Sequence, residues 1–333
     1  MTMQNVPRLR SLSTVQARLQ VQGPDARRYL HGMVSNDVQG LRPGQGCHAC
    51  LLSVKGKLVG DLVILDLGEP GLLLCLAAAA REGVLKTLDR HLIMDNATVR
   101  DASTELDALQ VIGTSAAEAL GRALPSLAAS DLGGLVRYSF AVATVGSAAL
   151  RVVAVPPLGE PTFSVIGPPA AVTTLRNALL ADGAQLLDEA QADILRVEAG
   201  LPEYGRDLDE DRMPAEAGLN DAVSFDKGCY MGQEVVVRLR DRGHLNRRLC
   251  GLRIATEGAL PAVGSKLRSP DRPQAAVLTS VVRSPRFGAI GLAYVHRSAW
   301  EPGTQLELLG TADEPTGQVA TVVSLPFADG SVA

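Results

Sequence analysis

The sequence predicts an α+β fold, with two ferredoxin-like split-βαβ units followed by a C-terminal β-barrel. Three observations lead to this prediction. Before Leu249, strand and helix patterns recur in blocks of the form strand–helix–strand–strand–helix–strand. From Leu249 onward, short strand patterns are separated by glycine and proline turns. The chain of 333 residues is also too long for one typical hydrophobic core.

The first block alternates between short apolar strands and helices. Strict alternation in ARLQV predicts a strand, while Pro24 and Asp25 mark the start of a helix. Gly56 lies in the turn of a predicted hairpin, and leucines at helical spacing predict a helix after it. The predicted strands are 17–21, 47–54, 58–67 and 71–77, and the predicted helices are 23–34 and 78–92.

The second block repeats this pattern and leads into the barrel. Its predicted strands are 106–113, 137–145, 149–156 and 162–167, and its predicted helices are 115–124, 168–183 and 189–202. The six barrel strands are predicted at 249–255, 265–269, 275–284, 288–295, 304–310 and 317–326. We therefore place the domain boundary between 1–248 and 249–333.

Composition and charge limit the location and the partners. No apolar run approaches the roughly 20 residues of a membrane span, and the first residues lack the apolar segment of a secretion signal. Five cysteines, an odd number, argue for a reducing compartment, so we expect a cytoplasmic protein. The net charge of −4 gives no general attraction to nucleic acid.

Charge changes sign sharply along one segment of the chain. Acidic residues dominate between Asp207 and Asp226, and cations, beginning with Lys227, dominate up to Arg248. Two solvated loops would explain this change. A concave site that presents cations to an anionic ligand is the alternative.

The CHAC segment at 47–50 is the one place where cysteine spacing invites a metal or redox interpretation. Residues three apart on a strand point to opposite faces, so Cys47 and Cys50 could not share a metal ion. We interpret both as structural and predict no metal site.

Three further residues stand out against their surroundings. Asp61 interrupts an otherwise apolar strand, which indicates either a pocket residue or a solvated edge strand. Glu198 lies in the last turn of a predicted helix, where the dipole favours cations, so it either accepts bonds from a ligand or is simply exposed. Cys229 follows Lys227 in a glycine-flanked loop and is either a reactive thiol or inert.

Several segments together resemble the YgfZ family, a branch of the folate-binding superfamily that includes the aminomethyltransferase (T-protein) of glycine cleavage. The segment KGCYMGQ at 227–233 is similar to the block that distinguishes this branch. YLHGMVSNDV at 29–38 and LLSVKGKLVGDLVIL at 51–65 resemble the family's early helix and its hairpin. The resemblance spans roughly residues 10–325.

The resemblance implies a three-lobed ring around a central channel that takes tetrahydrofolate or a one-carbon derivative. Within that channel, Glu198 matches the acid that bonds the pterin ring, and Tyr204 matches a ring that lines the pocket. Arg238 and Arg240 belong to a basic stretch that would face the glutamate tail of folate. As catalytic residues the resemblance implies Cys229, Asp61 and Lys227.

The leading functional prediction is a folate-binding protein of iron–sulfur cluster assembly or repair, with assembly factors or client enzymes, including tRNA-modifying ones, as partners. The alternative is a tetrahydrofolate-dependent aminomethyltransferase of the glycine cleavage type. Gly60 replaces the first of two aspartates usual in the transferases, and CLAAAA at 75–80 lacks their asparagine. Both departures favour the first function. Direct RNA binding by the basic stretch ranks last, because few aromatic residues accompany it.

Overall fold

The computed structural model describes residues 6–310 and 313–328. They form two compact units, and the chain passes between the units more than once. The first unit comprises the chain up to Glu189 together with Asp221–Gln233. The second comprises Ala190–Asn220 together with the chain from Glu234 onward. This division differs from the boundary at residue 248, which stays a prediction.

Two mainly antiparallel sheets form the first unit. One sheet has the order β3-β4-β5-β2-β6 and the other has the order β11-β1-β7-β10-β9-β8, with only β1 and β11 pairing in parallel among the described strands. Their bounds are β1 (Arg8–Ser11), β2 (Gln16–Gln22), β3 (Gly46–Leu52), β4 (Leu58–Asp66), β5 (Leu72–Ala77), β6 (Thr98–Asp101), β7 (Asp107–Ile112), β8 (Phe140–Val145), β9 (Ala148–Val155), β10 (Thr162–Gly167) and β11 (Gln185–Leu186).

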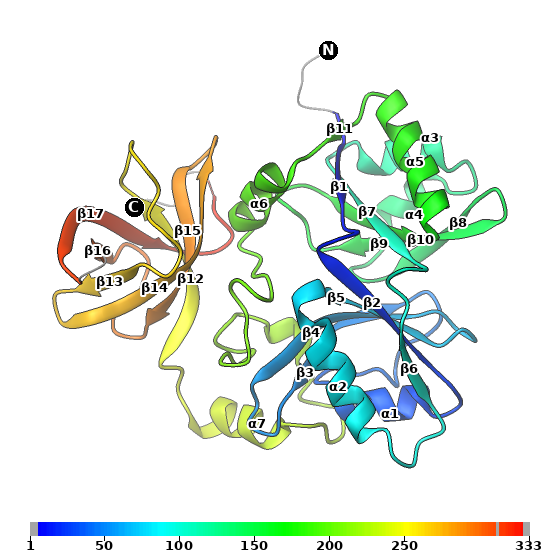
Figure 1. Ribbon diagram of the computed structural model, residues 1–333, viewed down its shortest axis with the longest axis horizontal. Coiled ribbons are helices and arrows are strands. Elements are labelled where there is room, and N and C mark those ends of the chain that lie inside the picture. The colour runs from blue at the N-terminus through cyan, green and yellow to red at the C-terminus, as the bar shows by residue number, and fades with distance from the viewer. Residues whose placement is uncertain (1–5, 311–312, 329–333) are drawn as a thin grey trace. The chain divides into compact units, whose positions relative to one another are not determined.

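Helices cover the outer face of each sheet, and the inner faces pack against each other. Figure 1 shows α1 and α2 on the side of the β2–β5 strands and α3 and α5 on the side of the β7–β10 strands. Leu65, Leu73 and Cys75 of the first sheet share one buried cluster with Val153 and Ile166 of the second. The helices of this unit are α1 (Ala26–Met33), α2 (Arg81–His91, after the 3-10 turn Ala78–Ala80), α3 (Ala116–Ala123), α4 (Ala129–Gly133) and α5 (Pro169–Ala181).

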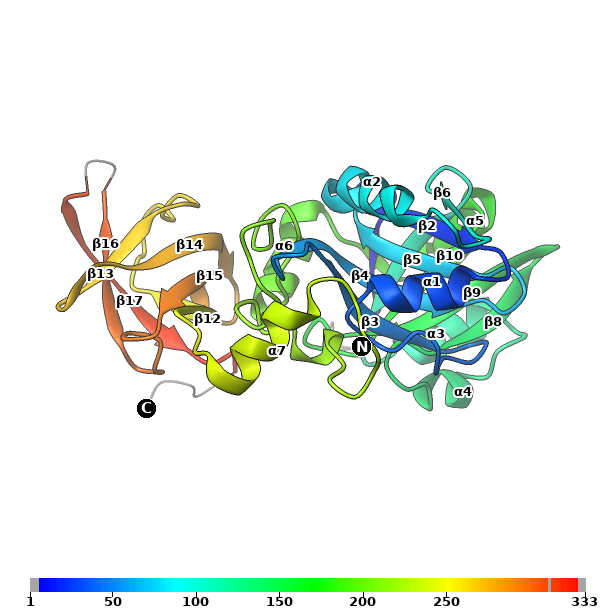
Figure 2. The same ribbon diagram turned by 90° about the horizontal axis from the view of Figure 1, so that it is seen from below.

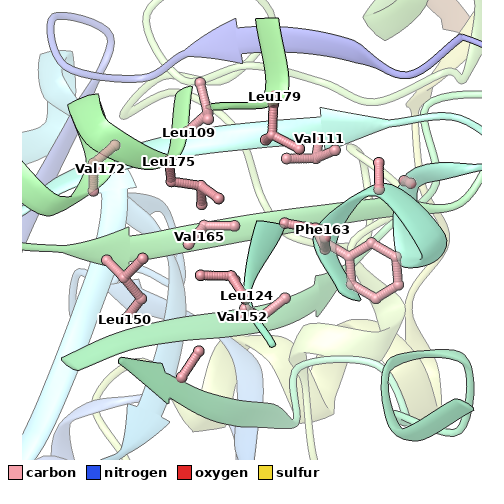
Figure 3. Packing of buried hydrophobic residues seen from close by; sticks show 14 of the residues in the cluster. Leu109, Val111, Leu124, Leu150, Val152, Phe163, Val165, Val172, Leu175 and Leu179 are labelled. Atoms are coloured by element: carbon pink, nitrogen blue, oxygen red, sulfur yellow. The ribbon is translucent and has the colours of Figure 1, made fainter. Parts of the chain in front are cut away.

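The main core of the first unit lies between α5 and its sheet. Proline at the first helical position starts α5, and its buried side chains recur at helical spacing. Figure 3 shows Val172, Leu175 and Leu179 of α5 pointing at side chains of β7, β9 and β10. The strand side chains labelled there are Leu109, Val111, Leu150, Val152, Phe163 and Val165. Apolar burial by this helix thus fixes it on the sheet.

The second unit contains a closed barrel, formed within the described residues by six strands in the order β12-β15-β14-β13-β16-β17. Figure 2 shows these strands in yellow to red, with α7 preceding them in the chain. Their bounds are β12 (Arg247–Ile254), β13 (Lys266–Ser269), β14 (Arg272–Ser284), β15 (Gly288–His296), β16 (Gln305–Leu309) and β17 (Pro315–Val323). The remaining helices are α6 (Glu189–Glu198), the 3-10 turn Asn220–Ala222 and α7 (Gln233–Arg242).

A buried ion pair attaches the segment after α6 to the barrel. Arg196 is 4% exposed and donates to Asp207 at 2.6 Å and to the Ser280 hydroxyl of β14 at 2.8 Å. Asp207 also accepts from the hydroxyl groups of Thr279 and Ser280, at 2.6 and 2.7 Å. Nearby, Val197 packs against Ile290 and other outer-face residues of the barrel. Both charges are therefore paired and hydrogen-bonded, as burial requires.

The α+β class and the closed six-stranded barrel of the described chain are confirmed. The predicted helices correspond to α1, α2, α3, α5 and α6. The sequence did not predict β1, β6, β11, α4 or α7, all of which are short or strongly polar. No described helix is long and apolar enough to cross a bilayer, and the cytoplasmic location stays a prediction.

Truncating Leu175 should destabilise the first unit, because it removes a side chain that is 1% exposed in the α5 core. We expect Leu175→Ala to lower the free energy of unfolding by about 2–5 kcal/mol. Leu180, on the same helix, is 36% exposed and provides the matched control, Leu180→Ala. Urea unfolding followed by far-UV circular dichroism measures both, while fluorescence of Trp300, the single tryptophan, reports on the barrel. Equal losses in the two variants would contradict the assignment.

Candidate functional site

A largely buried histidine lies between two carboxylates in the first unit. His48 lies on β3 and has its Nε2 2.5 Å from Oδ1 of Asp61 on β4. Its Nδ1 lies 3.2 Å from Oδ1 of Asp221. The His48 side chain is 11% exposed, while the Asp61 and Asp221 side chains are 26% and 48% exposed. Each ring nitrogen therefore faces a carboxylate oxygen where water has little access to the ring.

The register of the β3–β4 hairpin produces the contact between His48 and Asp61. Val63 is the Cα partner of His48, and Cys50 is the partner of Asp61. Residues two apart on a strand share a face, so His48 and Asp61 are diagonal neighbours on one face of the sheet. Asp61 was a predicted site residue, whereas neither His48 nor Asp221 was predicted.

Three neighbouring residues contact His48 or Asp221. The Tyr138 ring packs against it with a centroid distance of 5.8 Å and an interplanar angle of 44°. Arg137 lies beside Asp221, with Nη1 3.4 Å from Oδ2. The Asn36 side-chain amide donates to the carbonyl oxygens of His48 and Asp221, at 2.8 and 2.9 Å. The segment that begins at Asp221 is thus attached to β3 through side chain and backbone.

The charges of this cluster favour a protonated histidine. Burial alone opposes the charged form, but the nearby charges of Asp61 and Asp221 and their hydrogen bonds raise the pKa of His48 to about 10. Hydrogen bonding to His48 in turn lowers the pKa of Asp221. At neutral pH the cluster therefore contains an imidazolium between two acidic side chains.

Gly60 faces the opposite side of β4 from Asp61. A Cβ added at position 60 would overlap Cγ2 of Val84 on α2. An aspartate at this position would therefore point into the packing between the sheet and α2, away from His48. The replacement of the first aspartate by Gly60 leaves the face that carries Asp61 unchanged.

Lys227, a predicted catalytic residue, attaches its own segment to α1. Its Nζ donates to the carbonyl oxygens of His31, Val34 at 2.7 Å and Asn36 at 3.2 Å. These carbonyls lie at and just beyond the C-terminal end of α1, where the helix dipole favours a cation. Burial lowers the pKa of Lys227 to about 8, against the opposing charge of Asp37. All three ammonium protons thus have backbone acceptors.

Cys229 is exposed, whereas Cys50, Cys75 and Cys250 are buried and Cys47 is partly buried. Of the two glycines around Cys229, Gly232 is required by the backbone conformation. Gly232 has a φ of 81°, and an added Cβ would overlap the carbonyl oxygen of Ser53. Only glycine therefore fits where this loop passes over the β3–β4 turn.

Glu198 lies in the second unit, at the C-terminal end of α6, as predicted. It is 7% exposed, and its Oε1 accepts a hydrogen bond of 2.5 Å from the Ser284 hydroxyl. Its Oε2 has no hydrogen-bond partner among residues 6–310 and 313–328. A buried carboxylate with one donor retains acceptor capacity, which suits a ligand that carries N–H groups.

The other predicted folate-binding residues are also in the second unit. Tyr204 is partly buried in the loop after α6, and burial raises the pKa of its hydroxyl to about 12. Arg238 and Arg240 lie exposed on α7, next to Glu234 and Asp241, each at 2.6 Å. In the part of the chain that the structure describes, no group of three or more His, Cys, Asp or Glu residues is arranged to hold a metal ion.

Comparison with known proteins connects most of the chain to one family. Residues 12–227 match the GCVT N-terminal domain, and residues 247–329 match the glycine cleavage T-protein C-terminal barrel domain. A protein of Rubrobacter xylanophilus named aminomethyltransferase is 35% identical over 280 residues, which cover 82% of this chain and 72% of that protein. An aminomethyltransferase of Listeria welshimeri is 30% identical over 311 residues, covering 92% and 83%.

A solved structure has the same fold. The glycine cleavage system aminomethyltransferase T of Bartonella henselae superposes with a TM-score of 0.85 at 23% sequence identity. The superposition covers 98% of this chain and 87% of that one. The fold predicted from the sequence is therefore confirmed over nearly the whole chain.

These comparisons correct the leading functional prediction. The relatives are named aminomethyltransferases, so iron–sulfur cluster assembly is contradicted and the alternative prediction is supported. None of them supports the predicted cluster-assembly partners or singles out the YgfZ branch. Gly60 had favoured the wrong function, because the sequence did not reveal that position 60 faces α2. Tetrahydrofolate, the predicted cofactor, is the one that aminomethyltransferases of this family use, so that prediction is confirmed.

Cys229 should be the fastest of the five thiols to alkylate. Burial raises the pKa of Cys47 and Cys75 to about 12 and also raises the pKa of Cys50 and Cys250. The thiolate is the reactive form, so burial disfavours reaction of these four thiols, whereas Cys229 is exposed to the reagent. Brief treatment with iodoacetamide at pH 7, followed by peptide mass spectrometry, measures the order.

Two outcomes bear on this expectation. Cys229→Ser should remove the fast phase and leave the slow labelling of the other four thiols unchanged. Labelling of Cys250 at the same rate as Cys229 in the native protein would contradict the expected order.

Proposed function

Because the chain belongs to the glycine cleavage T-protein (GCVT) family, we propose that it is a tetrahydrofolate-dependent aminomethyltransferase of the glycine cleavage type. The observation that carries the proposal is the similarity to proteins named aminomethyltransferase over 82–92% of the chain. The substrates would be an aminomethyl group on a lipoyl carrier protein and tetrahydrofolate. The products would be ammonia, the reduced carrier and methylene-tetrahydrofolate.

Glu198 is the residue we assign to pterin binding. Its carboxylate is buried, has a single hydroxyl donor and retains Oε2 as an acceptor. The N–H groups at the edge of a pterin are donors that match such a carboxylate. Tyr204 would line the same pocket, and Arg238 and Arg240 would attract the carboxylates of the glutamate tail. A central channel for this ligand stays a prediction.

Asp61 is the residue we assign to the transfer step. Positive charge develops on the transferred carbon when it leaves the carrier sulfur, and a carboxylate near that carbon would stabilise the charge. Asp61 is partly exposed, and His48 occupies only one of its oxygens. It therefore has an oxygen available to the substrate.

The KGCYMGQ segment supports a finer assignment, to the YgfZ branch of this superfamily. Within that proposal, Cys229 is an accessible thiol available for chemistry. Lys227 would contribute by holding the segment in place through its bonds to the end of α1.

Aminomethyl transfer is directly measurable. With aminomethylated carrier protein and tetrahydrofolate, we expect wild-type protein to release ammonia and to form methylene-tetrahydrofolate. Asp61→Asn should lower kcat by at least about tenfold, because it removes a charge that acts in the transition state. No wild-type turnover above the blank, with a carrier that a known transferase accepts, would refute the proposed function.

Glu198→Gln should weaken tetrahydrofolate binding by at least about tenfold, since a charge-assisted hydrogen bond is worth about 1.5–3 kcal/mol. Glu189 lies at the opposite end of the same helix, where its side chain is 66% exposed, and Glu189→Gln is the matched control. Isothermal titration calorimetry measures both affinities, and thermal melts confirm folding. Unchanged affinity in folded Glu198→Gln would remove Glu198 from the binding site.

A further inference from the structure

We propose that His48 is the positioning residue for Asp61. In this proposal His48 is an imidazolium that donates one N–H to Asp61 and the other to Asp221. It holds the Asp61 carboxylate in one orientation and leaves Oδ2 to face a cationic or N–H-bearing part of the substrate. The role of Asp61 in transfer rests on the proposed function, but the protonation of His48 does not.

The hydrogen-bond geometry favours a proton on both ring nitrogens. Nε2 lies 2.5 Å from Oδ1 of Asp61, and Nδ1 lies 3.2 Å from Oδ1 of Asp221. A neutral imidazole has one N–H and one lone pair, and an ionised carboxylate only accepts. A neutral ring would therefore place a lone pair against one carboxylate. The raised pKa of His48 agrees with the doubly protonated form.

Residues from several parts of the first unit lie around the ring of His48 and its two aspartates. Tyr138 packs on the ring, and Arg137 pairs with the outer oxygen of Asp221. The buried thiol of Cys50 is on the same strand face, as the register partner of Asp61. Among the described residues, these groups and the two aspartates are the titratable and charged groups around the His48–Asp61–Asp221 cluster.

The backbone of Tyr138, the residue that packs on His48, has an unusual conformation. Its φ is 67°, in the left-handed region that bulky residues rarely adopt. Its N–H is nevertheless bonded to the carbonyl of Ala154 at 2.7 Å, and its side chain is only 6% exposed. The fold thus holds a strained residue against the ring of His48.

The consequence for Asp61 is a fixed carboxylate with one oxygen available. His48 occupies Oδ1, and Oδ2 has no partner within the described ranges, while 26% of the side chain is exposed. A group held in place before the substrate arrives loses less entropy during the reaction. His48 thereby acts through Asp61 and does not itself contact the substrate.

Nitrogen-15 NMR of the histidine rings tests the protonation state without any assay of activity. The protein contains five histidines, and loss of a signal in His48→Gln assigns His48. We expect both nitrogens of His48 to keep the chemical shifts of protonated imidazolium from pH 6 to about pH 9. A ring that becomes neutral below about pH 8 would overturn the proposal. Asp221→Asn should lower the midpoint, because it removes one of the two charges.

A double-mutant cycle tests whether His48 acts through Asp61. Glutamine carries no positive charge and cannot place N–H groups on opposite sides of a ring, so His48→Gln should lower kcat by about 10- to 100-fold. The KM for tetrahydrofolate should change by less than about twofold, because binding of the ground state does not involve this pair. In an Asp61→Asn background, His48→Gln should have little further effect. Multiplicative effects of the two substitutions would overturn the positioning role.

A matched histidine substitution controls for general damage. His91 lies exposed at the end of α2, and His91→Gln should leave kcat and the His48 signal unchanged. If wild-type protein shows no transfer while His48 remains doubly protonated, the proposed function is wrong, but the imidazolium between Asp61 and Asp221 is confirmed. If transfer is robust and His48 titrates as an ordinary histidine, the proposed role of His48 is wrong and the proposed function is supported.

Discussion

The alternation of side chains along β4 is the constraint on which the first unit depends. Both faces of this strand are covered, one by α2 and the other by the second sheet. Gly60 therefore makes room for Val84 of α2, while Asp61 points to the opposite face. A carboxylate there is costly without a partner, and the imidazole of His48 meets this requirement.

Patterns of neighbouring residues predicted the helices and strands whose boundaries depend on nearby residues. Helix α5 begins at proline and buries residues at helical spacing, and the barrel strands are separated by glycine and proline turns. The place of Glu198 at the end of α6 followed from the same reasoning. Helix α7 was missed because its polar, basic sequence buries little apolar surface, and only Val236 is buried in it.

The contacts of His48 with Asp61 and Asp221 could not be predicted from the sequence, for two physical reasons. A register shift between Leu51 and Leu52 leaves one extra residue in β4. Continuing the Leu52–Leu58 pairing without this shift would pair Asp61 with Ala49 and turn it away from His48. The second partner, Asp221, is 173 residues from His48, and no periodicity reports such a contact. The leading functional prediction was wrong because it rested on one short motif and on Gly60. Similarity over most of the chain instead supports an aminomethyltransferase.

The passage of the chain between the two units has a consequence for its synthesis on the ribosome. Arg196 emerges early, but its partner Ser280 lies 84 residues further on, so the guanidinium stays in water until the barrel strand β14 has been made. The first unit likewise lacks Lys227, and with it the bonds to the end of α1, until translation has passed through the segment that follows α6. Neither unit is a continuous stretch of chain, so a fragment ending at Glu189 would lack the last segment of the first unit and the whole of the second. Nascent chains should therefore acquire protease resistance late and in two steps, the first unit once Gln233 has emerged and the second once the barrel strands have followed.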